Sequence, residues 1–168
     1  INDHPEDRFF VDAWEDIAYT QWAYLDQYKG GADTLLQFAH AYPDSAAAPQ
    51  AIYDSARIFE KGTLLNEAAQ TWARLIDEYP LADISYQGLF LSGITYFRIA
   101  DYDLSLQAFQ RYLLLSATPY ERSAATFWNG KNYQAKKDEE KAVANFTQSA
   151  QTDPNGYYSE RAKEIING

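Results

Sequence analysis

The sequence predicts an all-α fold, a solenoid of antiparallel helix pairs that repeats every 37 residues. A helix-ending proline recurs at this step, because Tyr42-Pro43 is followed by Tyr79-Pro80. Three series of residues keep the same step, two of large side chains and one of small ones. They are Leu35, Trp72, Phe109 and Phe146; Trp22, Phe59, Tyr96 and Tyr133; and Gly31, Ala68, Ser105 and Ala142. An ordinary helical bundle is the alternative fold, but a bundle has no reason to keep a fixed step.

Within one repeat, apolar residues show helical spacing twice. Ile52, Ala56 and Phe59 are four and three residues apart, and Ala68 and Trp72 take up the spacing again after a break. Each repeat is therefore expected to be two antiparallel helices, which approach closely at the small residues while aromatic side chains fill the gap between them.

We expect one domain over residues 1–168. Its repeats are predicted at about 8–43, 46–80, 83–119 and 120–154. First helices are expected at 8–28, 46–61, 83–100 and 120–137, and second helices at 32–42, 64–79, 103–116 and 139–151. Residues 157–167 are predicted to form a closing helix over the open end of the solenoid. The first repeat is the least regular, because Tyr19 stands where later repeats have Ala56, Gly93 and Gly130.

Local signals support these helices. Thr118-Pro119-Tyr120-Glu121 has the pattern of a capping box with proline at the first helical position. The acidic runs 101–103 and 138–140 lie where second helices are expected to begin, and the helix macrodipole stabilises anions there. We therefore interpret these carboxylates as structural and expect no catalytic residue in the chain.

Composition excludes several classes of function. The net charge of -10, from 14 basic and 24 acidic residues, argues against a nucleic-acid partner. There is no cysteine, and the two histidines, His4 and His40, lie far apart in the sequence, whereas a zinc site needs three or four convergent ligands, so we expect neither metal nor cofactor. No apolar run approaches the roughly 20 residues that cross a bilayer. The start at Ile1 has no signal-peptide pattern, and we expect the chain to be a processed piece of a longer protein.

Residues 124–154 resemble a tetratricopeptide repeat (TPR). Gly130, Tyr133, Ala142, Phe146 and Pro154 stand where this family has its signature small, aromatic and proline residues. The resemblance implies a right-handed superhelix that binds protein or peptide partners on a concave face lined by first helices. Departures from the family pattern are the 37-residue length, Asn129 in place of a leucine, and Lys137 in place of the turn glycine.

The positions carried over from the family predict a concave groove. Its twelve residues are Asp16, Thr20, Tyr53, Arg57, Lys61, Gln87, Phe90, Ile94, Arg98, Phe127, Lys131 and Gln134. Because four of them are basic, an acidic peptide or a C-terminal carboxylate is the expected ligand. The alternative is that these residues form solvated helix faces.

A narrower resemblance lies at the C-terminal end. The run 127–131, the pair Lys137-Asp138 and the run 153–162 with its Gly156-Tyr157-Tyr158 are similar to the repeat region of soluble lytic murein transglycosylases. This resemblance implies a scaffold beside a peptidoglycan-cleaving domain, with glycan strands as partners of the parent protein. The joint Tyr42-Pro43-Asp44-Ser45 resembles envelope lipoproteins that assist outer-membrane protein assembly, which implies the alternative of a free-standing peptide-binding adaptor. Both resemblances imply the bacterial cell envelope, periplasmic or otherwise extracytoplasmic.

Overall fold

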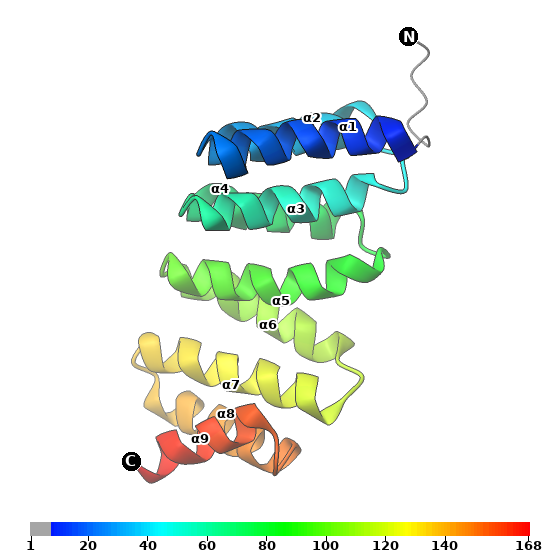
Figure 1. Ribbon diagram of the computed structural model, residues 1–168. Coiled ribbons are helices and arrows are strands. Elements are labelled where there is room, and N and C mark those ends of the chain that lie inside the picture. Colours follow the sequence, from blue (N-terminus) through cyan, green and yellow to red (C-terminus); the bar gives the residue numbers. More distant parts are fainter. Residues whose placement is uncertain (1–7) are drawn as a thin grey trace. The chain divides into compact units, whose positions relative to one another are not determined.

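The computed structural model describes residues 8–168, and this range is helical throughout apart from short joints (Figure 1). The predicted all-α fold of paired helices is confirmed. The elements are α1 (Arg8–Tyr19), a π-helical segment η1 (Thr20–Tyr24), α2 (Tyr28–Ala41), α3 (Ala48–Lys61), α4 (Leu65–Glu78), α5 (Asp83–Arg98), α6 (Tyr102–Leu115), α7 (Pro119–Ala135), α8 (Glu139–Thr152) and α9 (Tyr157–Asn167).

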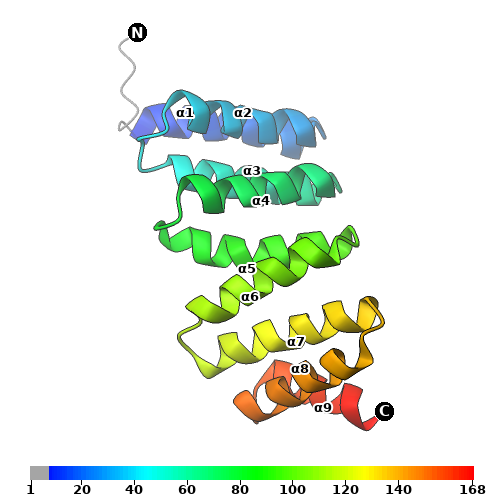
Figure 2. The same cartoon turned by 180° about the vertical axis from the view of Figure 1, so that it is seen from behind.

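The chain divides into two compact units, Ile1–Gly88 and Leu89–Gly168, with the division inside α5. In the first unit α1 packs on α2, α2 on α3, and α3 on α4, and Figure 2 shows α3 and α4 side by side from behind. In the second unit α6 packs on α7, while α8 contacts both α7 and α9. That residues 1–168 form one domain stays a prediction.

The core of each unit is built from the large residues of the 37-residue series. Leu35 and Trp72 are buried in the first unit, and Phe109 and Phe146 in the second. Close approach of the helices explains the glycine opposite one of these rings. A Cβ added at Gly130 would lie 2.7 Å from the ring of Phe146, so no larger residue fits without displacing that ring.

The helix starts are capped as the sequence predicts. Thr118 Oγ1 accepts a hydrogen bond from the Glu121 amide at 3.2 Å, and Glu121 Oε2 accepts one from the Thr118 amide at 2.9 Å. Together they form the predicted capping box before α7, with Pro119 at the first helical position. Asp101 caps α6 in a simpler way, because its carboxylate accepts from the Leu104 amide at 3.1 Å.

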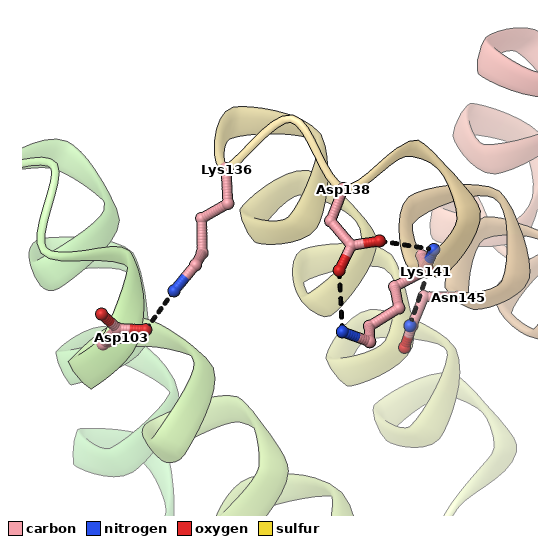
Figure 3. A network of polar contacts seen from close by, with 5 residues as sticks. All are labelled: Asp103, Lys136, Asp138, Lys141 and Asn145. Atoms are coloured by element: carbon pink, nitrogen blue, oxygen red, sulfur yellow. Dashed lines mark hydrogen bonds and ion pairs between the residues drawn. The ribbon is translucent and has the colours of Figure 1, made fainter.

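A polar network surrounds the start of α8 (Figure 3). Asp138 accepts from the Lys141 amide at 3.2 Å and pairs with Lys141 Nζ at 2.7 Å, and these hydrogen bonds lower the pKa of its carboxyl. Lys136 forms an ion pair with Asp103, which ties the end of α7 to the start of α6. Asn145 donates to the carbonyl of Lys141 at 2.9 Å. Every charge in this network has a structural role, in agreement with the interpretation of these carboxylates as structural.

The first helical repeat differs from the predicted one. Instead of a single helix over 8–28, α1 ends at Tyr19, η1 follows, and α2 already begins at Tyr28. A Cβ at Gly31 would lie 2.8 Å from the carbonyl oxygen of Ala18, so α1 and α2 leave no room between them for a large side chain. Tyr19, in the position of a small residue, is instead 49% exposed, and the helix widens directly after it.

At the C-terminal end α9 covers part of α7 and α8. Three buried serines, Ser123 on α7, Ser149 on α8 and Ser159 on α9, join the three helices through mutual hydrogen bonds of 3.0 Å from Ser123 to each of the other two. Phe127 lies under the same helix, with its ring 5.5 Å from that of Tyr158. The burial of these groups explains why α9 stays attached to a repeat that would otherwise expose them.

Candidate functional site

The candidate site is a pocket in the first unit, with a volume of about 480 Å³. One wall is formed by α1 and η1 and the other by α3. Leu35 of α2 adds a buried apolar side chain to the lining. Its lining residues are Glu15, Asp16, Ala18, Tyr19, Trp22, Leu35, Tyr53, Asp54, Arg57, Ile58 and Lys61. The pocket therefore combines a buried apolar floor with aromatic and charged walls, the composition of a ligand site.

Helical spacing brings each wall together. Glu15, Ala18 and Trp22 are three and four residues apart, so they project from one side of the helix. On α3, Tyr53 and Arg57 are four residues apart in the same way. Because α2 packs against both α1 and α3, it holds the two walls together, and its Leu35 contributes to the pocket lining.

Two aromatic contacts hold the pocket walls in place. The ring of Tyr53 meets that of Trp72 edge to face at 5.0 Å, which ties α3 to the core under it. On the opposite wall Tyr19 and Trp22 form an edge-to-face pair at 5.4 Å. The aromatic surfaces are thus fixed before any ligand arrives, which lowers the entropic cost of binding.

The carboxylates of the pocket repel one another. Burial raises the pKa of Glu15, and the charges of Asp54, Asp12 and Asp16 raise it further. Burial also raises the pKa of Asp54, while a hydrogen bond from Gln50 Nε2 at 2.9 Å and the charge of Arg57 act in the opposite direction. The acidic wall is therefore held at a cost in electrostatic energy.

The two cations of the pocket are already engaged. Arg57 Nη1 pairs with Glu60 Oε2 at 2.9 Å. Lys61 Nζ lies 4.1 Å from the centre of the Trp22 ring, a cation–π contact between the two walls. Neither cation is a free anchor for an incoming anion.

Four of the twelve predicted groove residues, Asp16, Tyr53, Arg57 and Lys61, line this pocket. Thr20 lies on η1, and Gln87 on the part of α5 that belongs to the first unit; both are exposed. The other six belong to the second unit. They are Phe90, Ile94 and Arg98 on α5 and Phe127, Lys131 and Gln134 on α7. That the twelve form one groove stays a prediction.

Phe127 was predicted to line the groove surface, but the structure places it in the core. It is only 8% exposed and belongs to a cluster with Ala142, Phe146 and Ala162, because α9 covers it. The family positions do not reveal this burial, since they describe a repeat whose first helix has no closing helix across it. Phe127 is a core residue of the second unit.

Seven of the eleven residues that line the pocket are not among the groove residues predicted from the sequence. Glu15 and Asp54 were not predicted to be site residues, and Trp22 was assigned only to the repeated aromatic series. A signal was present, because Glu15 and Trp22 share a helical face with Asp16 close by. The contribution of α1 could not be placed, however, without knowing that its helix ends in a π-helical segment.

Other candidate sites find no support in the described residues. His40 is exposed on α2, and His4 lies outside the described range. Between residues 8 and 168, no group of three or more histidine, aspartate or glutamate side chains is arranged to hold a metal ion. No helix in that range combines the length and apolarity needed to span a membrane.

Comparison with known proteins agrees with the geometry. Residues 50–82 match the model of the tetratricopeptide repeat family. MamA residues 41-end from Desulfovibrio magneticus RS-1 superimposes with a TM-score of 0.65 at 13% identity, covering 94% of this chain and 91% of that one. The nearly identical TPR-like repeats of a Podosopora anserina protein described as a kinesin light chain give 0.68 at 11% identity, covering 98% and 85%. No curated protein is significantly similar to the chain in sequence.

These features define the class of protein. The helix pairs, the repeat matched at residues 50–82 and the structural neighbours confirm a solenoid fold of the TPR type. Such a fold is typically a non-catalytic scaffold for protein interaction. At identities of 10–15% the neighbours share the fold with this chain, and their partners are their own.

Proposed function

We propose that this chain is a non-catalytic interaction scaffold that binds a peptide segment of a partner protein in the pocket between α1 and α3. The observation that carries the proposal is the pocket itself, which combines aromatic walls with charged residues from the first helices of two successive repeats. Four of the pocket residues are also the ones that the family resemblance implies for ligand contact.

The pocket chemistry suits a side chain of a peptide better than a small metabolite. Tyr53 and Trp22 offer rigid aromatic area at little entropic cost, which is typical of residues that dominate peptide interfaces. Glu15, Asp16 and Asp54 would select the partner by charge. A volume of about 480 Å³ accepts one or two side chains of an extended peptide.

Selection from a random peptide library, followed by calorimetry with the enriched peptides, tests this function. Tyr19→Ala removes a pocket residue that is 49% exposed, and Tyr157→Ala removes a matched tyrosine on α9 that is 64% exposed. We expect Tyr19→Ala to weaken the enriched peptides by about tenfold, as loss of an aromatic contact residue does, and Tyr157→Ala to leave affinity unchanged. Enriched peptides that lose affinity only in Tyr157→Ala, or no enrichment at all, would contradict the proposal.

For the parent protein we propose the repeat region of a soluble lytic transglycosylase that takes part in peptidoglycan turnover in the bacterial cell envelope. Its support is the similarity of residues 127–162 to that family, with Gly156-Tyr157-Tyr158 at the start of α9. A reading frame that continues beyond Gly168 into a lysozyme-like domain would agree with this parent. A frame that ends there would exclude it.

The alternative parent is a free-standing envelope adaptor, which the joint Tyr42-Pro43-Asp44-Ser45 favours by its similarity to envelope lipoprotein repeats. A lipoprotein signal before Ile1 with no domain after Gly168 distinguishes it from the transglycosylase. In either parent the chain itself carries no catalysis. Release of soluble muropeptides from purified peptidoglycan by this chain alone would overturn that part of the proposal.

A further inference from the structure

The basic residues of the pocket have partners within the chain, whereas two of its acidic residues do not form ion pairs with any residue that the structure describes. Both cations are engaged, Arg57 with Glu60 at 2.9 Å and Lys61 with the Trp22 ring at 4.1 Å. In contrast, neither Glu15 nor Asp16 forms an ion pair with any residue that the structure describes, although both line the pocket. The pocket is therefore complementary to a positively charged ligand.

The third carboxylate lies on the opposite wall. Asp54 on α3 accepts only a neutral partner, the Gln50 amide at 2.9 Å, and it contributes to the electrostatic repulsion felt by Glu15. Carboxylates from α1 and α3 thus share one opening, and a cation between them would relieve their repulsion. An anionic ligand would instead add to it.

The aromatic residues of the pocket walls favour a guanidinium group over other cations. Tyr19 and Trp22 line the acidic side, and Tyr53 lies next to Asp54. A guanidinium group stacks on aromatic faces and also binds carboxylates through two parallel hydrogen bonds, whereas an ammonium group is a compact, strongly hydrated charge. Within residues 8–168 the acidic side chains do not have the arrangement that holds a metal ion. The chemistry of the pocket is therefore that of an arginine site.

We infer that the pocket between α1 and α3 binds an arginine side chain of the partner peptide, with Glu15, Asp16 and Asp54 as its carboxylate partners. This inference rests on the proposed function and deepens it. It replaces the acidic peptide expected from the sequence, because the two basic groove residues that line this pocket, Arg57 and Lys61, already have partners within the chain.

Nuclear magnetic resonance titration of the ¹⁵N-labelled chain at low salt tests the inference. The probes are acetyl-Gly-Arg-Gly-Arg-Gly-amide and its counterparts with lysine or glutamate in place of arginine. Two variants carry the same change of net charge. Glu15→Gln/Asp54→Asn alters the pocket, and Glu139→Gln/Glu140→Gln alters two exposed carboxylates on α8.

We expect the arginine peptide to shift amide signals of α1, η1 and α3 and to bind more tightly than the lysine peptide. In Glu15→Gln/Asp54→Asn its Kd should rise by at least about fivefold, whereas in Glu139→Gln/Glu140→Gln it should change by less than about twofold. Both pocket substitutions keep side-chain volume, and they remove charges that repel each other, so the variant is expected to fold.

Equal weakening in the two variants would overturn the inference, because it would mean attraction by the net charge alone. Tighter binding of the glutamate peptide at the pocket amides would also overturn it, while leaving peptide binding at this pocket intact. If none of the three peptides shifts amide signals of the pocket, the arginine site is excluded, and the library selection then decides separately whether the pocket binds any peptide.

Discussion

Ala100 and Lys137, at the same position of successive repeats, both leave a first helix in the left-handed conformation with φ of 62°. The same conformation occurs at Thr63, 37 residues before Ala100, with φ of 59°, and at Asp26, 37 residues before Thr63, with φ of 53°. Glycine is the residue that adopts it without strain, yet none of the four turns has glycine at this position. The repeat geometry therefore imposes the backbone conformation regardless of the residue.

Ala100→Gly is expected to stabilise the chain. Alanine in the left-handed region is strained, and removing its Cβ should raise the free energy of unfolding by about 0.5–1 kcal/mol after the entropy cost of glycine. The measurement is equilibrium urea denaturation. Ala144→Gly, in the exposed interior of α8, is the matched control and should lower the free energy of unfolding by about 1 kcal/mol. A destabilised Ala100→Gly would mean that the turn is not under strain.

Gly130→Ala is expected to destabilise the second unit, although the same change in an ordinary helix stabilises it. The new Cβ would lie 2.7 Å from the Phe146 ring, and such overpacking costs about 1–3 kcal/mol. Phe146→Leu makes space, so the double variant Gly130→Ala/Phe146→Leu should lose less than the sum of the single losses. Additive losses in denaturation experiments would show that the ring is not what excludes the methyl group.

Glu15→Gln/Asp54→Asn is expected to be more stable than the unmodified chain at neutral pH. Both carboxyls have a pKa raised by burial, so the folded state holds their protons more tightly and their ionisation weakens folding as pH rises through the raised values. Below the ordinary pKa values of 4.5 for Glu15 and 3.8 for Asp54, this advantage of the variant should disappear. Melting temperatures between pH 3 and pH 8 measure this effect, whose main cause is burial of both carboxyls, with repulsion by neighbouring carboxylates adding to it at Glu15. A stability difference that does not depend on pH would contradict the raised pKa values of the two carboxyls.

Arg57→Ala is expected to strengthen binding of the arginine peptide by about twofold to fivefold, because it removes a competing cation from the pocket. Lys131→Ala, a basic residue of the predicted groove in the second unit, should leave the affinity unchanged. Calorimetric titration compares the two. Weaker binding in Arg57→Ala would instead favour an anionic ligand, as the sequence alone suggested.

The sequence predicts the fold because the buried core residues recur at a constant spacing along the chain. Leu35, Trp72, Phe109 and Phe146 are buried at a constant step, and Gly130 reports the close approach of helices that such rings require. Thr118 and Glu121 mark a helix start through local chemistry alone. These features depend on spacing within and between repeats, which a single sequence displays.

The remaining features depend on what the repeats pack against. Tyr19 breaks the small-residue series, but the sequence does not show that a π-helical segment follows it, nor that Gly31 of α2 comes close to Ala18 of α1. Phe127 has the spacing of a surface residue until α9 covers it. The sequence displays the basic residues of α3, and only the structure reveals that Glu60 already satisfies Arg57.

A crystal structure of the chain with an enriched library peptide tests the central claim most directly. The claim predicts peptide density in the pocket between α1 and α3, in contact with Tyr53 and Trp22 and with a basic side chain near Glu15 and Asp54. Density confined to α7 or α9, with this pocket empty, would contradict it.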